Sequence, residues 1–76
     1  MMLKSLQSRF GGTWDGGDTE IHGLLELGDQ KLKIELLFIK ATLKWQCCLF
    51  KAGEVVSIES GDDPMLLVNR AVAAAM

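Results

Sequence analysis

Residues 24–36 constrain the fold more than any other part of the chain. Polar and apolar residues alternate without a break from Lys31 to Leu36, which is the period of a strand with one buried face. Gly28-Asp29-Gln30 precedes this run, where a hairpin needs a residue that tolerates a positive φ. The stretch therefore predicts two antiparallel strands joined by a tight turn.

The remaining segments are assigned by their spacing of apolar residues and by their terminal residues. Leu3, Leu6 and Phe10 form one helical stripe, and Asp63 before Pro64 is typical of a helix start. We predict one α+β domain over residues 1–76: a four-stranded antiparallel β-meander, with a short N-terminal helix and a C-terminal helix packed on one of its faces. The predicted elements are a helix from Met1 to Phe10, strands at Thr19 to Leu27, Lys31 to Ile39, Leu43 to Lys51 and Val55 to Glu59, and a helix from Pro64 to the end of the chain.

A second assignment competes with this one between residues 35 and 50. Lys40-Ala41-Thr42 contains neither glycine nor proline, and several residues nearby are good helix formers. The spacings of seven, four and seven between Lys33, Lys40, Lys44 and Lys51 would also place these lysines on one face of a helix. We prefer two strands, because Lys31 to Leu36 and Leu43 to Cys47 both alternate with period two.

The segment from Gly11 to Asp18 has four glycines among its eight residues and is predicted to be a loop. Its tryptophan, Trp14, has two interpretations. The side chain either folds back over a thin core, which we favour, or remains available as an anchor for a partner.

Composition and cysteine placement exclude several classes of protein. A chain of 76 residues buries only about 60% of its unfolded surface. Its net charge of −2 lacks the basic balance typical of nucleic-acid binding. Cys47 and Cys48 are adjacent, so on a strand their thiols point to opposite faces and stay reduced, which suggests a cytoplasmic protein. The sequence shows no signal peptide, and Glu35 to Phe50 is too charged to span a membrane.

No pattern of catalytic or ligand-binding residues is present in the sequence. His22 is the only histidine and has no nucleophile or metal-ligand spacing around it. Asp15, Asp18 and Glu20 indicate a solvated acidic loop rather than a calcium site. The paired glycines lack the lysine and serine of a phosphate-binding loop. We therefore predict no enzymatic activity, no cofactor and no bound metal.

The order of elements from Leu43 onward resembles the end of a double-stranded-RNA-binding domain, in which a strand, a turn, a short strand and an alanine-rich helix follow one another. The resemblance covers less than half of the chain and implies only that order of elements. The family carries lysines at the start of the helix, whereas this chain has Asp62, Asp63 and Pro64 there.

The sequence predicts a non-catalytic interaction protein. It would bind another macromolecule through the outer sheet face and the glycine loop, with inhibition of that macromolecule as one outcome. Phage accessory proteins and inhibitors of host machinery are analogous in their small size and acidic charge. Two alternatives are a nucleic-acid-binding module that uses the lysines of the second and third strands, and a homodimeric structural domain. A protein partner ranks first, and no membrane contact is expected. The predicted partner-binding residues are Trp14, Leu24, Lys31, Lys33, Leu37, Ile39 and Lys44.

Overall fold

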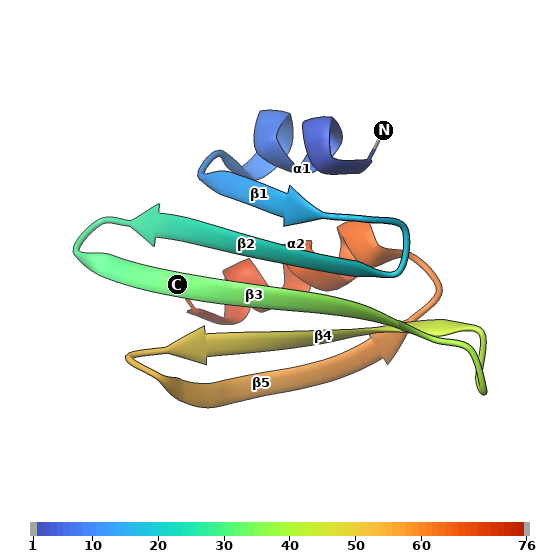
Figure 1. Cartoon of the computed structure of the whole chain (residues 1–76). Coiled ribbons are helices and arrows are strands. Elements are labelled where there is room, and N and C mark those ends of the chain that lie inside the picture. Colours follow the sequence, from blue (N-terminus) through green and yellow to red (C-terminus); the bar gives the residue numbers. More distant parts are fainter. Residues whose placement is uncertain (1, 76) are drawn as a thin grey trace.

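Five strands, each hydrogen-bonded to the next in chain order, form a single antiparallel sheet (Figure 1). The computed structural model describes residues 2–75. The predicted α+β meander with two terminal helices is confirmed, but the predicted number of four strands is wrong. The elements are α1 (Met2–Phe10), β1 (Thr13–Gly16), β2 (Glu20–Leu27), β3 (Gln30–Ile39), β4 (Lys44–Lys51), β5 (Glu54–Gly61) and α2 (Pro64–Ala75).

The additional strand, β1, lies within the segment that was predicted to be a loop. It pairs with β2 from Thr13 opposite Leu24 to Gly16 opposite Ile21. Gly12 and Gly16 stand at its two ends with φ of 77° and 137°, and a Cβ on either would overlap the β2 backbone. The glycines therefore allow β1 to approach β2 closely, and they do not disrupt the strand.

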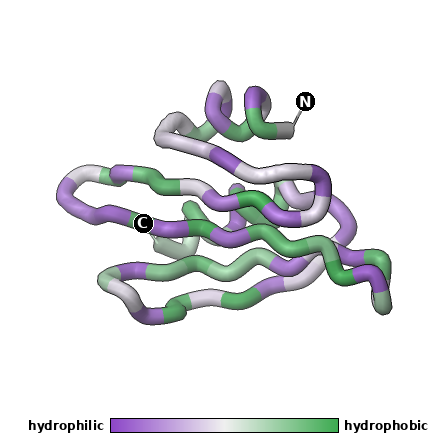
Figure 2. Tube along the Cα trace, in the orientation of Figure 1, coloured by the Kyte–Doolittle hydropathy of each residue, from purple (hydrophilic) through white to green (hydrophobic). Residues whose placement is uncertain are grey.

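The core lies between the sheet and the helices. Alternation along β2 and β3, visible in Figure 2, directs one set of side chains toward the helices and the other toward solvent. Among the described side chains, no polar or charged residue is buried. The core residues are Leu6, Ile21, Leu25, Leu32, Ile34, Leu36, Cys47, Leu49, Leu67, Val68 and Ala71.

The alternative helix over residues 35–50 is wrong. Residues 40–43 form the turn between β3 and β4, which Thr42 closes by donating its backbone N–H to the carbonyl of Ile39 over 3.2 Å. Leu43 takes the left-handed conformation, with φ of 55°, where glycine is usual. The third strand was predicted to begin at Leu43, but β4 begins at Lys44 and the Leu43 side chain is 72% exposed. This exposure lets a residue other than glycine occupy the turn without disturbing the core.

Both helices lie on the same side of the sheet and begin or end as their sequences predict. Gly11 follows α1 with φ of 74° and donates its N–H to the carbonyl of Gln7 over 2.8 Å, as a C-terminal glycine cap does. Leu6 of α1 joins the same core as Leu67 of α2. Within the described part of the chain, no helix is long and apolar enough to cross a membrane.

Asp63→Ala is expected to destabilise the protein by about 0.5–2 kcal/mol. Asp63 Oδ1 accepts the backbone N–H of Met65 over 3.0 Å, so the substitution leaves an N–H group at the start of α2 without its cap. Asp62→Ala is the matched control, because Asp62 is exposed and precedes the cap. Thermal unfolding followed by circular dichroism measures both, and equal losses would contradict the assignment of Asp63 as the cap.

Candidate interaction surface

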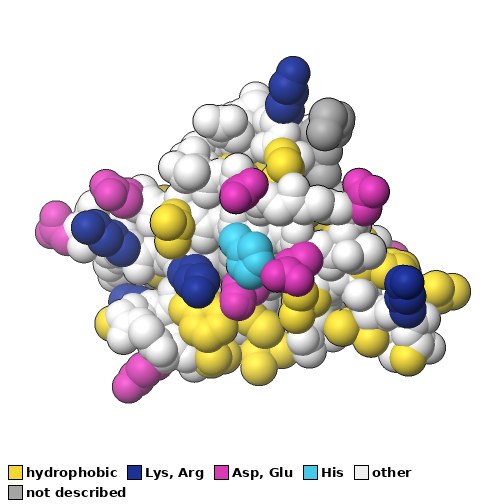
Figure 3. Space-filling view, viewed as in Figure 1, with side chains coloured by type: hydrophobic (Ala, Val, Ile, Leu, Met, Phe, Trp, Pro, Cys, Tyr) yellow, Lys and Arg dark blue, Asp and Glu magenta, His cyan; other side chains and the backbone are white. Residues whose placement is uncertain are grey.

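The sheet face opposite the helices, which we call the open face, is shown in Figure 3. Strand register places its side chains in rows that run across the sheet. One row passes from Asp15 through His22, Glu35 and Cys48 to Ile58. The row therefore changes from polar on β1, β2 and β3 to apolar on β4 and β5, and in Figure 3 hydrophobic side chains gather over the lower strands.

The alternation of β5 is inverted relative to an ordinary edge strand. Antiparallel strands usually direct apolar residues toward the core and polar residues toward solvent. In β5 the half-buried side chains are Ser57 and Glu59, whereas Val56 and Ile58 are 52% and 57% exposed. Cys48 pairs with Ile58, so the apolar residues of β5 share the open face with the outward residues of β4.

An apolar cluster results, which we call the open-face patch. Phe50 pairs across the sheet with Val55 on one side and Lys33 on the other, and Lys33 Nζ lies 5.6 Å from the centre of its ring. This cation–π contact covers part of the ring. The patch consists of Leu37, Cys48, Phe50, Val55, Val56 and Ile58.

The open face also holds the other two apolar residues that the sequence predicted there. Leu24 is 60% exposed but lies on β2, opposite Lys33, two strands away from Phe50. Ile39 is half-buried at the end of β3. The predicted contribution of β3 is thus in place, and the contribution of β5 was missed.

The predicted lysines do not converge. Lys31 and Lys33 lie toward the β2–β3 turn, whereas Lys44 pairs with Ile39 at the opposite end of the sheet. Lys44 Nζ also lies 4.0 Å from a carboxylate oxygen of Asp62. The three lysines therefore form no common basic surface.

Trp14 lies on the helix side of the sheet and packs against the core. Its indole N–H donates to the carbonyl of Gly11 over 2.8 Å. The ring occupies the space above Gly23, its partner in the ladder, where a Cβ would overlap it. The structure therefore agrees with the interpretation of Trp14 as a cover for the core, and it places Trp14 away from the open face.

Two groups of the open face have chemistry of their own, a histidine and a thiol. His22 Nε2 lies 2.7 Å from Glu20 Oε1. Burial, with the nearby Glu35 charge, raises the pKa of the Cys48 thiol, so this thiol is not activated. In residues 2–75, no three His, Cys, Asp or Glu side chains are grouped to hold a metal ion.

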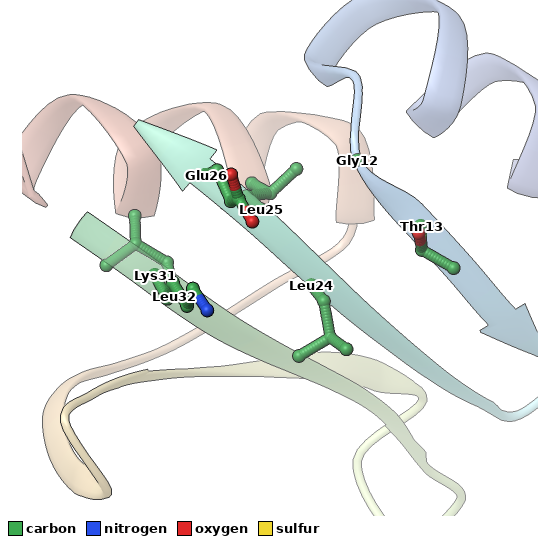
Figure 4. A pocket seen from close by; sticks show the side chains of 7 residues that line it. All are labelled: Gly12, Thr13, Leu24, Leu25, Glu26, Lys31 and Leu32. Carbon is green, nitrogen blue, oxygen red and sulfur yellow. The ribbon is translucent and has the colours of Figure 1, made fainter. Parts of the chain in front are cut away.

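A shallow groove of about 500 Å³ lies beside the start of β1, where β2 extends past its shorter neighbour (Figure 4). Leu24 and Leu25 leave β2 toward opposite sides of the sheet next to it. Its charged lining residues are Glu26 and Lys31, which pair across the two strands. Because these two charges have opposite signs, the groove carries no excess of either charge.

Comparisons with protein-family models, with curated proteins and with solved structures found no match to this chain.

Proposed function

We propose that the protein is a non-catalytic binding module whose open-face patch binds another protein. The inverted alternation of β5 carries this proposal. Val56 and Ile58 are exposed, and Ser57 and Glu59 point inward. The isolated protein therefore lacks the hydrophobic stabilisation that it would gain if the opposite register buried Val56 and Ile58. The pattern is favourable if the open face is covered in the functional state.

The charges beside the patch indicate the chemistry of the partner. Glu35 is adjacent to Cys48, and Asp15 and Glu20 lie farther along the same side of the open face. A partner segment that covers the patch meets this acidic border. We therefore propose an amphipathic segment with lysine or arginine next to its apolar side. If the segment bound by this protein belongs to a functional surface of the partner, binding would inhibit the partner.

Substitution within the patch tests the proposal. Leu37→Lys combined with Phe50→Lys removes apolar contacts from β3 and β4 and adds charge next to the basic part of the partner. Proteins captured from the native host by wild type would be identified and purified, and their affinities measured by titration calorimetry. We expect at least about tenfold weaker binding by the double variant.

Leu66→Lys is the matched control, because Leu66 is exposed on α2, in the helix layer. It should bind the purified partner as wild type does, and circular dichroism should show all variants folded. Equal affinity of the double variant and wild type would refute binding through the patch. Equal loss with Leu66→Lys would assign the contact to the helix side.

A further inference from the structure

The two edges of the sheet differ in their protection. Edge strands present unpaired N–H and C=O groups, which proteins usually cover or keep short. β1 has four residues and packs against α1. β5 has eight residues, contains neither proline nor lysine, and no described segment pairs with its outer side (Figure 1).

We infer that two copies of this chain associate through their β5 edges, antiparallel about a twofold axis at Ile58, to form a continuous ten-stranded sheet. Pairing between copies supplies partners for the free backbone groups of β5. The open face of one copy then continues into the open face of the other. This dimer does not depend on the proposed partner, although it would join two open-face patches into one surface.

The position of the axis follows from the residues of β5. Paired residues in an antiparallel ladder lie on the same face, so the twofold axis lies midway between one residue and the same residue of the second copy. An axis at Glu59 would set two carboxylates against each other, which is destabilising. An axis at Val56 or Ser57 would place the irregularity between β4 and β5, at Leu49 and Phe50 opposite Ser57 and Val55, in the centre of the new ladder.

An axis at Ile58 avoids both difficulties. It sets Ile58 against Ile58 of the second copy, and Ser57 against Glu59, within the regular part of β5. Glu59 Oε1 lies 4.0 Å from Nη1 of Arg70 on α2, so its charge has a neighbour on the helix side. On the open face, the two residues that meet at the axis are therefore both isoleucine.

Sedimentation equilibrium over a roughly 1,000-fold range of protein concentration tests the inference on the full chain. An edge contact is smaller than the roughly 800 Å² per partner of a standard interface, so we expect a reversible dimer of micromolar affinity. Ile58→Lys and Ile58→Glu should each be monomeric, because like charges meet at the axis. Mixed in equal amounts, they should form a heterodimer.

Leu24→Lys is the matched control, since Leu24 is as exposed on the same face but lies on β2; it should dimerise as wild type does. Ile58→Cys in a Cys48→Ala background gives an independent result. Oxidised glutathione should link two copies through residue 58, and Leu24→Cys in the same background should not be linked.

A wild-type protein that stays monomeric at every concentration would overturn the inference, as would a dimer that Ile58→Lys leaves intact. Neither result affects the open-face proposal, which the Leu37 and Phe50 variants test separately. If that double variant lost partner binding but still dimerised, the result would support binding through the patch and would leave the dimer unaffected.

Discussion

Gly23→Val is expected to lower the free energy of unfolding by about 3 kcal/mol, which is most of what the core of so small a domain supplies. Gly23 is buried on β2, and the Trp14 indole lies over its Cα. Any side chain at this position must displace the ring, which is held by its hydrogen bond to Gly11. Displacing it opens the end of the core that α1 and β1 cover together.

Gly17→Ala is the control for this substitution. A Cβ on Gly17 has no atom within 4 Å, and its φ lies outside the left-handed range, so we expect stability equal to or slightly above that of wild type. Urea unfolding followed by circular dichroism measures both variants. If Gly23→Val were as stable as Gly17→Ala, Trp14 would not rest on Gly23, and its interpretation as a partner anchor would regain support.

A double-mutant cycle isolates the contact itself. Trp14→Ala should cost less stability when Gly23 is already alanine, because the indole has by then left its position. We expect a coupling energy of about 1 kcal/mol. Additive effects would mean that Trp14 and Gly23 stabilise the protein independently.

The sequence predicted the elements whose information is local. Alternation in β2 and β3 and the cap at Asp63 depend on residues close together in the chain, and the structure confirms them. The strand β1 was missed because four glycines indicate a loop by composition. Only the neighbouring β2 backbone explains why Gly12 and Gly16 have no side chain.

The open-face patch could be predicted only in part, because part of it depends on how one strand pairs with another. Leu24, Leu37 and Ile39 were placed on the outer face because their strands alternate regularly. The facing of Val56 and Ile58 depends on how β5 pairs with β4, including the irregularity at Leu49 and Phe50. A one-residue change in register reverses every side chain of a strand, so local sequence does not determine which residues of β5 are exposed.

Cys47 should make the protein lose stability in alkali. Burial, with smaller contributions from the charges of Cys48 and Glu59, raises the pKa of its thiol from 9.0 to about 12. Between these values the unfolded chain loses the thiol proton and the folded chain keeps it. Folding then takes up a proton, so stability is fully present below pH 9.0 and falls as pH rises toward 12.

The expected loss approaches about 1.4 kcal/mol per pH unit within this window, measured as the change in urea unfolding free energy between about pH 8 and about pH 11 under reducing conditions. Cys47→Ala should be less stable than wild type at the lower pH because of the cavity it leaves, but its stability should fall less steeply with pH. The chain has no tyrosine, so no phenol titrates within this window.

Cys48→Ala, at a half-buried position on the opposite face, should retain most of the wild-type slope. Parallel curves for wild type and Cys47→Ala would show that water reaches the Cys47 thiol, and therefore that the sheet and α2 do not close over it.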